Sequence, residues 1–162
     1  RSALLPMRNP DDWTGAHWLG EKVKADTLIP AGWSYHRVYE SETTYLNPPP
    51  ETTPCTKPNV TNVWKNGAFG RVLWWTHGSA TSALDVMDTS YAAQLNNDHP
   101  SITFQCSCHN GSPETTTNLA YTLLKKGAIC AIGDTRVSWY EQGESSFIPS
   151  RTAGSASTST VW

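Results

Sequence analysis

Residues 70–79 of this 162-residue chain read GRVLWWTHGS, an apolar run of strand-forming residues that stops at His77 and a glycine. Residues 102–111 read ITFQCSCHNG and stop in the same way at Cys108. Parallel strands covered on both faces are near-continuous apolar runs, and their carboxyl ends are where ligands bind. The two stretches therefore predict neighbouring core strands that present His77 and Cys108 at one edge of a parallel sheet.

Helical patterns alternate with these core strands. Residues 9–26 predict a helix with Asn9 as its N-cap, Pro10 at its first position and acidic residues in its first turn. The other predicted elements are a strand at 33–39, a helical turn at 62–66, a helix beginning after Asp88, a helix capped by Ser112 and stopped by Gly127, and a strand at 128–132. This order predicts an α/β fold, a three-layer αβα sandwich with a mainly parallel sheet.

Composition limits both domain number and partners. The length predicts one domain, which we place at residues 1–141, followed by a tail rich in Gly, Ser and Thr at 142–162. Only 16% of the residues are charged and the net charge is −2, so the sequence gives no electrostatic case for nucleic acid or a membrane surface. A proline-rich polar connection at 41–62 is either a cover for a site or a solvated excursion.

The four cysteines are too few and too unevenly spaced to indicate a disulfide scaffold. Cys106 and Cys108 alternate on one strand and share a face, whereas Cys130 lies in an apolar run typical of a core. Two glycosylation triplets begin at Asn59 and Asn110 and favour a secreted or cell-surface protein.

Thiol catalysis needs the groups that end the two core strands. A cysteine attacks as its thiolate, and an imidazole can take up that proton or protonate a departing amine. In acyl transfer the carbonyl oxygen gains negative charge, which backbone N–H groups at a tight turn can receive. Gly78, directly after His77, and the amide of Cys108 are the candidate donors.

Three blocks of the sequence together resemble the gingipain family of cysteine peptidases, which have the caspase-like fold. The blocks are residues 74–79, residues 107–111 and residues 127–139, and they follow the family's order. The resemblance implies His77 as the acid and base, Cys108 as the nucleophile, and Gly78 and the Cys108 amide as the oxyanion donors. It also implies Trp139 as a wall of the pocket for the residue that precedes the scissile bond.

Gingipains cleave after Arg or Lys by means of an acidic pocket residue, and no motif identifies that residue in this chain. Asp134 lies at a suitable strand end, where Arg136 would either neutralise it or select an acidic side chain; Glu40 and Glu42 are further candidates. The resemblance also implies that the first strand of the fold lies upstream of this chain, unless another segment supplies it. The fold is then incomplete without a further chain or domain.

Other interpretations compete with this one. Cys106 is an alternative nucleophile, and Cys106, Cys108, His109 and His77 are an alternative zinc set, although their spacing is not that of a zinc site. Calcium occurs in relatives of the caspase-like fold, but Asp85 and Asp88 alone make no ligand loop. We therefore predict a cysteine endopeptidase that acts on proteins or peptides with no catalytic metal and no organic cofactor; a structural calcium ion is left open by the sequence. A catalytically inactive binding or scaffold domain, or one fragment of a processed assembly, is the alternative function.

Overall fold

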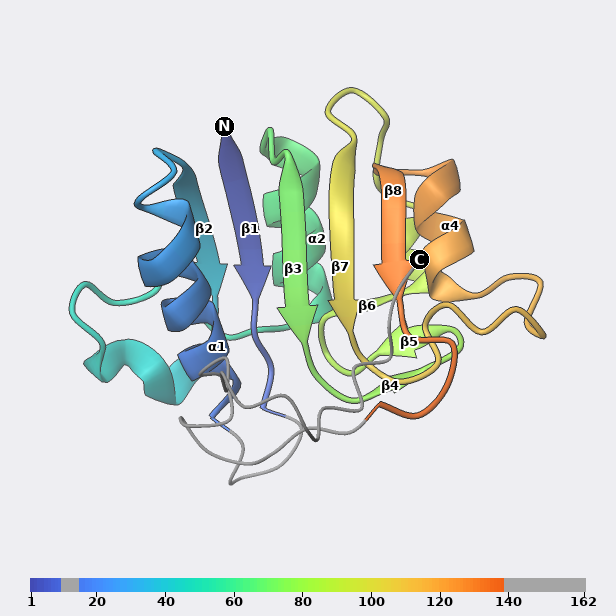
Figure 1. Ribbon diagram of the computed structural model, residues 1–162, viewed down its shortest axis with the longest axis horizontal. Coiled ribbons are helices and arrows are strands. Elements are labelled where there is room, and N and C mark those ends of the chain that lie inside the picture. The colour runs from blue at the N-terminus through green and yellow to red at the C-terminus, as the bar shows by residue number, and fades with distance from the viewer. Residues whose placement is uncertain (10–14, 139–162) are drawn as a thin grey trace, which may run out of the picture.

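The computed structural model describes residues 1–9 and 15–138 and is built on a five-stranded sheet (Figure 1). The strands stand in the order β2-β1-β3-β7-β8, and every neighbouring pair is parallel. All five carboxyl ends therefore lie at one edge of the sheet. The strands are β1 (Ser2–Pro6), β2 (Ser34–Val38), β3 (Arg71–Trp75), β7 (Ser101–Cys106) and β8 (Ala128–Gly133).

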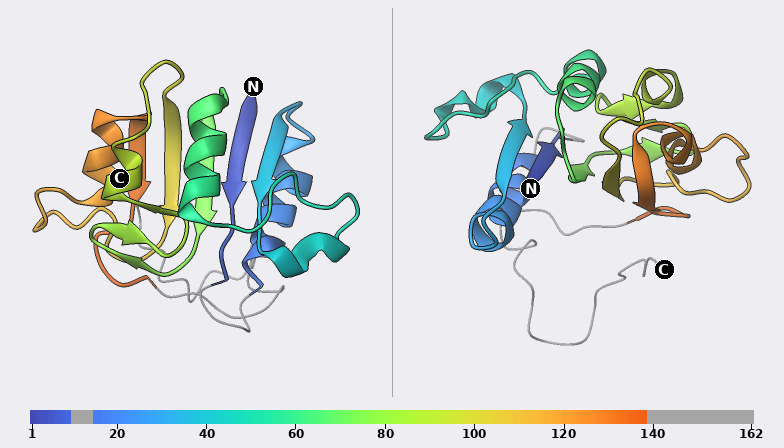
Figure 2. Two further views of the ribbon diagram at one scale, coloured as in Figure 1. Left: turned by 180° about the vertical axis from the view of Figure 1, so that it is seen from behind. Right: turned by 90° about the horizontal axis from the view of Figure 1, so that it is seen from above.

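Helices cover both faces of the sheet, which confirms the predicted α/β class (Figure 2). On one face α1 (Ala16–Val23), continued by a π-helical stretch (Lys24–Leu28), lies over β1 and β2. On the other face lie α2 (Lys57–Asn66), α3 (Thr89–Ala92) and α4 (Leu119–Lys125). The predicted strand at 33–39 and both core strands are confirmed within one or two residues.

Strand alternation divides the core between these two layers. Val72 and Trp74 of β3 pack with the apolar faces of α2, α3 and α4, whereas Trp75 packs with the residues beneath α1. Trp74 is completely buried. Because β3 is the central strand and is filled on both sides, the position of its carboxyl end is determined by packing from both layers.

The strand β1 is formed by a segment in which the sequence analysis predicted no element. Residues 2–6 pair with both β2 and β3. Leu4 and Leu5 are fully buried on opposite faces. A short apolar run has no diagnostic period, so periodicity did not reveal this strand.

The helix starts differ from those predicted. The first helix begins at Ala16 rather than near residue 10, and the Ala16 amide donates to the Asn9 side chain at 2.6 Å; Pro10, Asp11 and Asp12 lie outside the described residues. The last helix begins at Leu119 with Asn118 as its N-cap. The predicted cap Ser112 instead donates to the Glu114 carboxylate at 2.8 Å, because residues 113–118 form turns.

Two features of the connections were also not predicted. The helix α2 begins at Lys57, with Thr56 as its N-cap and a proline in its first turn, so it takes up the last part of the predicted 41–62 connection, residues 57–62, and it includes the predicted helical turn at 62–66. A short 3-10 helix (Ser41–Tyr45) takes up another part. A small antiparallel sheet follows β3 and consists of β4 (Gly78–Ser79), β5 (Ser82–Ala83) and β6 (Met87–Asp88).

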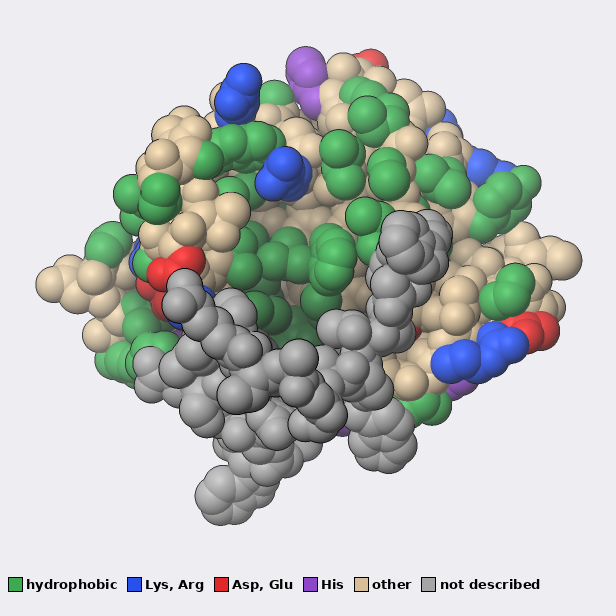
Figure 3. All heavy atoms as spheres, in the orientation of Figure 1, with side chains coloured by type: hydrophobic (Ala, Val, Ile, Leu, Met, Phe, Trp, Pro, Cys, Tyr) green, Lys and Arg blue, Asp and Glu red, His purple; other side chains and the backbone are tan. Residues whose placement is uncertain are grey.

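One part of the sheet remains apolar and open beside α1 (Figure 3). The side chains of Leu73, Ile102, Phe104 and Ile132 help to line a hollow of about 440 Å³ there. Ile102 and Phe104 are 40% and 44% exposed, although the residues that alternate with them along β7 are buried. No helix in the described part of the chain is long and apolar enough to cross a membrane.

Candidate active site

His77 and Cys108 lie at the same level of the carboxyl edge. The last register pair of the adjacent strands β3 and β7 is Trp75 with Cys106, and each candidate residue lies two positions beyond its member of that pair. The Thr76 amide extends the pairing by donating to the Cys106 carbonyl at 3.1 Å. Adjacent parallel strands 4.7–4.9 Å apart bring the two chain segments together, as predicted.

Gly78 contacts the backbone of Cys108 directly. A Cβ at position 78 would lie 2.8 Å from the Cys108 nitrogen and still closer to its carbonyl oxygen. Both obstacles are backbone atoms, so only a glycine allows this approach without displacing one of the two segments. The structure thus brings together the two predicted oxyanion donors, Gly78 and Cys108.

The Cys108 sulfur is half-buried and faces Ser138. The Ser138 amide donates to the sulfur at 3.4 Å, and the carbonyl and hydroxyl oxygens of Ser138 both lie 3.6 Å from it. Within the described residues, the Cys108 amide makes no hydrogen bond to a backbone carbonyl. Among the described residues, no backbone carbonyl competes for this N–H group.

His77 is exposed and lines a shallow cavity of about 220 Å³ with residues of the β4–β5 hairpin. Its carbonyl accepts a hydrogen bond from the Leu84 amide at 2.8 Å, and the Thr76 hydroxyl donates to the Leu84 carbonyl at 3.1 Å. The backbone that carries His77 is therefore fixed to the hairpin, while its ring remains accessible.

Two other cysteines, Cys106 and Cys55, have environments that disfavour a thiolate. Burial, together with the negative charge of Asp134, raises the pKa of Cys106 to about 12. Burial also raises the pKa of Cys55, which is 2% exposed. A thiol with a raised pKa is almost entirely protonated at neutral pH and is a poor nucleophile. These environments argue against Cys106 as the alternative nucleophile.

The acidic pocket candidates lie in three different settings. Asp134 is buried directly after β8, and Arg136 makes an ion pair with Glu114 at 2.6 Å. Glu40 is buried and accepts hydrogen bonds from Arg8 at 2.6 Å and from a backbone amide at 3.0 Å. Glu42 is exposed. The predicted pocket wall Trp139 lies outside the described residues.

Burial raises the pKa of Glu40, although the positive charge of Arg8 acts in the opposite direction. Arg8 also donates to the Asp85 carboxylate at 2.9 Å. Asp85 belongs to the turn between β5 and β6, so this one guanidinium connects the ends of β1 and β2 to the hairpin that follows His77.

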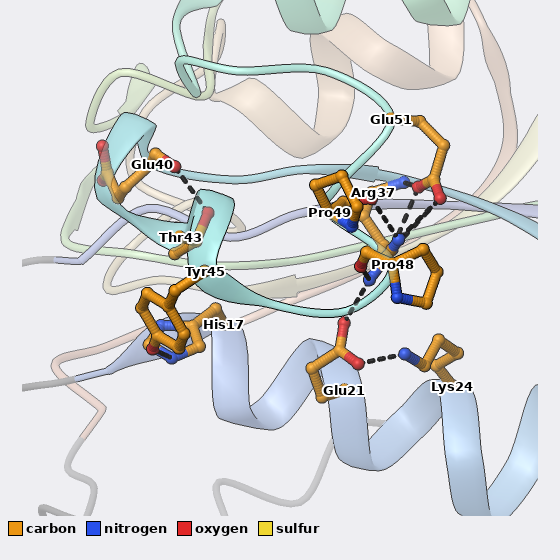
Figure 4. Close-up of polar contacts among 10 residues, drawn as sticks. All are labelled: His17, Glu21, Lys24, Arg37, Glu40, Thr43, Tyr45, Pro48, Pro49 and Glu51. Atoms are coloured by element: carbon orange, nitrogen blue, oxygen red, sulfur yellow. Dashed lines mark hydrogen bonds and ion pairs between the residues drawn. The ribbon is translucent and has the colours of Figure 1, made fainter.

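At the β2 edge of the sheet, Arg37 anchors the proline-rich segment (Figure 4). Its side chain is completely buried and forms ion pairs with Glu21 of α1 at 2.9 Å and with Glu51 at 2.7 Å. It also donates to the carbonyls of Pro48 and Pro49 at 3.2 and 2.7 Å. A guanidinium has five donors in a fixed plane, which allows it to hold a helix and a loop at the same time.

Glu21, Lys24 and Glu51 complete this cluster. The Glu21 carboxylate also pairs with Lys24 on the next turn of the helix. Burial would raise the pKa of Glu21 and of Glu51, but hydrogen bonds from Lys24 and Arg37 to Glu21, and from Arg37 to Glu51, outweigh it and lower both pKa values. The segment at 47–52 is therefore held by charges at neutral pH and is not a freely solvated excursion.

A second contact holds the same connection to α1. The Tyr45 hydroxyl and the His17 ring are hydrogen-bonded at 2.8 Å. Burial lowers the pKa of His17, which favours its neutral form.

The described residues hold no cluster of three or more His, Cys, Asp or Glu side chains that would bind a metal ion. The two aspartates considered for calcium already serve other groups, since Asp85 pairs with Arg8 and Asp88 pairs with Lys57 at 2.9 Å. Asp88 also caps α3, as predicted. These two carboxylates do not converge on a calcium site.

Two polar residues at the site were given no catalytic role from the sequence. Ser138 was part of a resembling block but had no assigned function, and its contact with Cys108 joins segments 30 residues apart. Asn110 was noted only as the first residue of a glycosylation triplet, and its side chain is completely buried. Its position within the turn that carries Cys108 was the signal available in the sequence.

Comparisons with known proteins bear on the family and the fold of the chain. The model of peptidase family C25 matches residues 10–155. The crystal structure of the Arg-specific cysteine proteinase gingipain R (RgpB) superimposes with a TM-score of 0.63 at 18% identity, over 85% of this chain and 32% of that one. The complex of Porphyromonas gingivalis RgpB pro- and mature domains gives a TM-score of 0.61 at 15% identity, over 86% and 33%.

The chain therefore spans about a third of the length of these solved structures, and their likeness bears on the fold alone. No curated protein matches the chain.

Proposed function

The chain belongs to peptidase family C25, a family of cysteine peptidases, and on that premise we propose that it hydrolyses internal peptide bonds with a Cys108–His77 dyad. The observation that carries the proposal is the register of β3 and β7, in which His77 and Cys108 follow the same residue pair. The close contact of Gly78 with the Cys108 backbone supports it, because it brings two amide donors to the same place.

In the first step the Cys108 thiolate attacks the carbonyl carbon of the scissile bond, and the carbonyl electron pair moves onto oxygen. The Gly78 and Cys108 amides receive this negative charge. The C–N bond then breaks, and His77, which has taken up the thiol proton, transfers it to the departing amine. The product of this step is an acyl-thioester on Cys108.

In the second step a water molecule takes the place of the departed amine. His77 removes a proton from the water as it attacks the thioester, and the same two amides stabilise the second tetrahedral intermediate. Collapse of that intermediate expels the Cys108 sulfur, which recovers the proton from His77. The exposure of His77 on the shallow cavity gives water a route to its ring.

Cleavage profiling on a peptide library tests this function. The wild-type chain is expected to cleave within peptides, and Cys108→Ala is expected to lose that activity while retaining its fold. Cys106→Ala is the matched control, because it removes a thiol two residues away on the same strand and should retain activity. Hydrolysis that is unchanged in Cys108→Ala would refute the mechanism.

For selectivity we propose Asp134 and Trp139 as contacts of the side chain that precedes the scissile bond. Asp134 follows β8, the strand next to β7, and Arg136 is engaged by Glu114. A carboxylate in that place favours a cationic residue, and the similar gingipain R is described as Arg-specific. Kinetics with matched peptides ending in Arg, Leu or Glu test this, and Asp134→Asn should reduce the preference for Arg.

We further propose that another chain or domain completes the fold and that the protein acts outside the cell or on its surface. The apolar hollow beside α1 supports the first part, because side chains such as Phe104 are only partly covered. Hydrogen exchange of β7, compared between this chain and the longest natural form of the protein, tests it. Fractionation of the producing cells tests the second part.

A further inference from the structure

Asn110 is a buried amide whose every polar atom has a partner. It is completely buried, two residues after Cys108, in the turn that ends β7. Its Nδ2 donates to the Ser79 carbonyl at 2.6 Å and to the Ser82 carbonyl at 3.1 Å. Its Oδ1 accepts a hydrogen bond from the Ser107 hydroxyl. A buried side chain with this many bonds has a fixed position.

The neighbouring donors determine which way the Asn110 amide points. The Trp74 indole nitrogen lies 2.9 Å from the Ser107 hydroxyl oxygen, and an indole only donates. The Ser107 hydroxyl therefore accepts from Trp74 and directs its own hydrogen to the Asn110 oxygen. The nitrogen of Asn110 must then face the two carbonyls, which is the orientation observed.

These bonds join the two halves of the proposed site. Ser79 and Ser82 face each other across the β4–β5 hairpin, which begins at Gly78. Asn110 belongs to the turn that carries Cys108. One side chain therefore holds the Cys108 turn against the hairpin that follows His77, across 31 and 28 residues of sequence.

The first turn of α4 holds the same two segments by its backbone. The Leu119 amide donates to the Ala80 carbonyl at the tip of the hairpin at 2.7 Å, and the Ala120 amide donates to the Asn110 carbonyl at 3.0 Å. The hairpin and the turn are therefore fixed to a common element as well as to each other. Asn110 adds the hydrogen bond to the Ser79 carbonyl, which belongs to the residue directly after Gly78.

We propose that Asn110 is a positioning residue for the reaction, which sets the relative placement of the Gly78 and Cys108 amides that receive the oxyanion. This inference rests on the proposed function. Gly78 already lies against the Cys108 backbone, and a small movement of the hairpin would separate the two amides. Loss of one oxyanion donor costs about 10²- to 10³-fold in kcat. Asn110→Ala removes both bonds to the hairpin and should show a loss of this size, with KM changed less than about threefold because ground-state binding does not need the oxyanion donors.

Two reagents separate positioning from a merely structural role. A peptide aldehyde forms a tetrahedral adduct with Cys108 and needs the oxyanion donors, whereas iodoacetamide alkylates the sulfur without forming an oxyanion. In Asn110→Ala the affinity for a panel of peptide aldehydes, measured by calorimetry, should fall at least about 100-fold, in line with the loss of one oxyanion donor. The rate of Cys108 alkylation should stay within about threefold of wild type.

Asn97→Ala is the matched control. Asn97 also joins segments distant in sequence, since its Nδ2 donates to the Lys125 carbonyl at 3.3 Å and its Oδ1 accepts from the Gly127 amide at 2.9 Å, but these bonds lie at the C-terminal end of α4, away from the hairpin. Its loss should lower stability without changing kcat or aldehyde affinity. Ser107→Ala is a second test if Asn110→Ala does not fold, because it frees the Asn110 oxygen and should weaken aldehyde binding about tenfold.

Two results would overturn the proposal. One is an aldehyde affinity in folded Asn110→Ala, or in folded Ser107→Ala if Asn110→Ala does not fold, that stays within threefold of wild type. The other is a parallel loss of aldehyde binding and alkylation, which would indicate general disruption of the turn. Failure of the proposed function would give a different result, because the wild-type chain itself would not hydrolyse peptides. The comparison of aldehyde binding with alkylation would still report on the placement of the two amides.

Discussion

Two parts of the sheet's carboxyl edge are held by different kinds of interaction: a neutral end, at the carboxyl ends of β3 and β7, and an ionic end, at the carboxyl end of β2. Beyond β3 and β7, uncharged groups join the Cys108 turn to Ser79 and Ser82, since Trp74, Ser107 and Asn110 form a continuous buried series of hydrogen bonds; the Arg8–Asp85 ion pair acts further along, at the β5–β6 turn. Beyond β2, charges hold it, since Arg37 joins Glu21 and Glu51. The same edge of one sheet therefore contains a neutral network and an ionic one.

The difference follows from what each end must do. Neutral hydrogen bonds fix a turn without adding a formal charge close to the Cys108 sulfur and His77. An ion pair that is partly desolvated is stronger than a neutral bond, and it holds a long proline-rich segment with few contacts. The predictions below test this division, and the largest expected effect comes first.

Gly78→Ala should damage the neutral end most. Its Cβ would be 2.8 Å from the Cys108 nitrogen, so the hairpin must move away from the turn and the two amide donors must separate. Steady-state kinetics should show a kcat reduced about 10²- to 10³-fold. Gly70→Ala is the control, because a Cβ there meets only ordinary contacts at 3.7 Å or more. Equal kcat values in the two variants would contradict the account.

Arg37→Met should damage the ionic end. Removing the guanidinium leaves two partly buried carboxylates without their partner, which should lower the free energy of unfolding by about 3 kcal/mol in urea titration. Arg37→Lys keeps the charge but loses the planar set of donors, so an intermediate loss is expected. At temperatures where Arg37→Met is folded, Cys108 alkylation should match wild type. A large fall in alkylation would show that the two ends are not separate.

Acid should affect the ionic end before the neutral one. The folded-state pKa values of Glu21 and Glu51 lie below their ordinary value of 4.5. Their contribution to stability is therefore present above pH 4.5 and is lost as the pH falls through the lower folded-state values. Hydrogen exchange, corrected for its intrinsic pH dependence, should show the Thr52 amide, which donates to the Arg37 carbonyl, losing protection in acid while the amides of residues 78–83 keep theirs. Simultaneous loss in both segments would argue against the division.

The smallest effect is expected at the exposed ion pair between Arg136 and Glu114. An exposed pair contributes little because water and salt screen it. Arg136→Gln should therefore leave the urea midpoint and the peptide preference unchanged. A new preference for neutral or acidic peptides in this variant would instead make Arg136 a selectivity residue, which was one of the possibilities open from the sequence.

The strands that carry the site were predictable, because buried parallel strands are long apolar runs and β3 and β7 each end at a glycine-containing turn. Asp88 and Gly127 were also correctly assigned to helix ends. The strand β1 was not predicted, because a five-residue apolar run has no period. The helix starts were misplaced although Asn9 and Ser112 have the residue types of N-caps: the Asn9 side chain accepts from the amide seven residues further on, and Ser112 donates to the Glu114 carboxylate instead of capping a helix.

The same limit applies to the site. His77, Gly78 and Cys108 could be proposed because the chemistry of each is local to its strand end. The roles of Asn110, Ser138 and Arg37 depend on partners 14 to 31 residues away in the sequence. Asn110 in particular belongs to a glycosylation triplet, and only its burial shows that its amide serves the interior.

The most direct test of the central claim is competitive alkylation of the four cysteines at neutral pH, followed by mass spectrometry, in wild type and in His77→Ala. The account predicts that Cys108 of the wild-type chain reacts at least about tenfold faster than Cys106, whose thiol is held protonated, and that His77→Ala removes most of this difference. Slow and equal labelling of Cys108 and Cys106 in the wild-type chain, or a Cys108 rate that does not depend on His77, would contradict it.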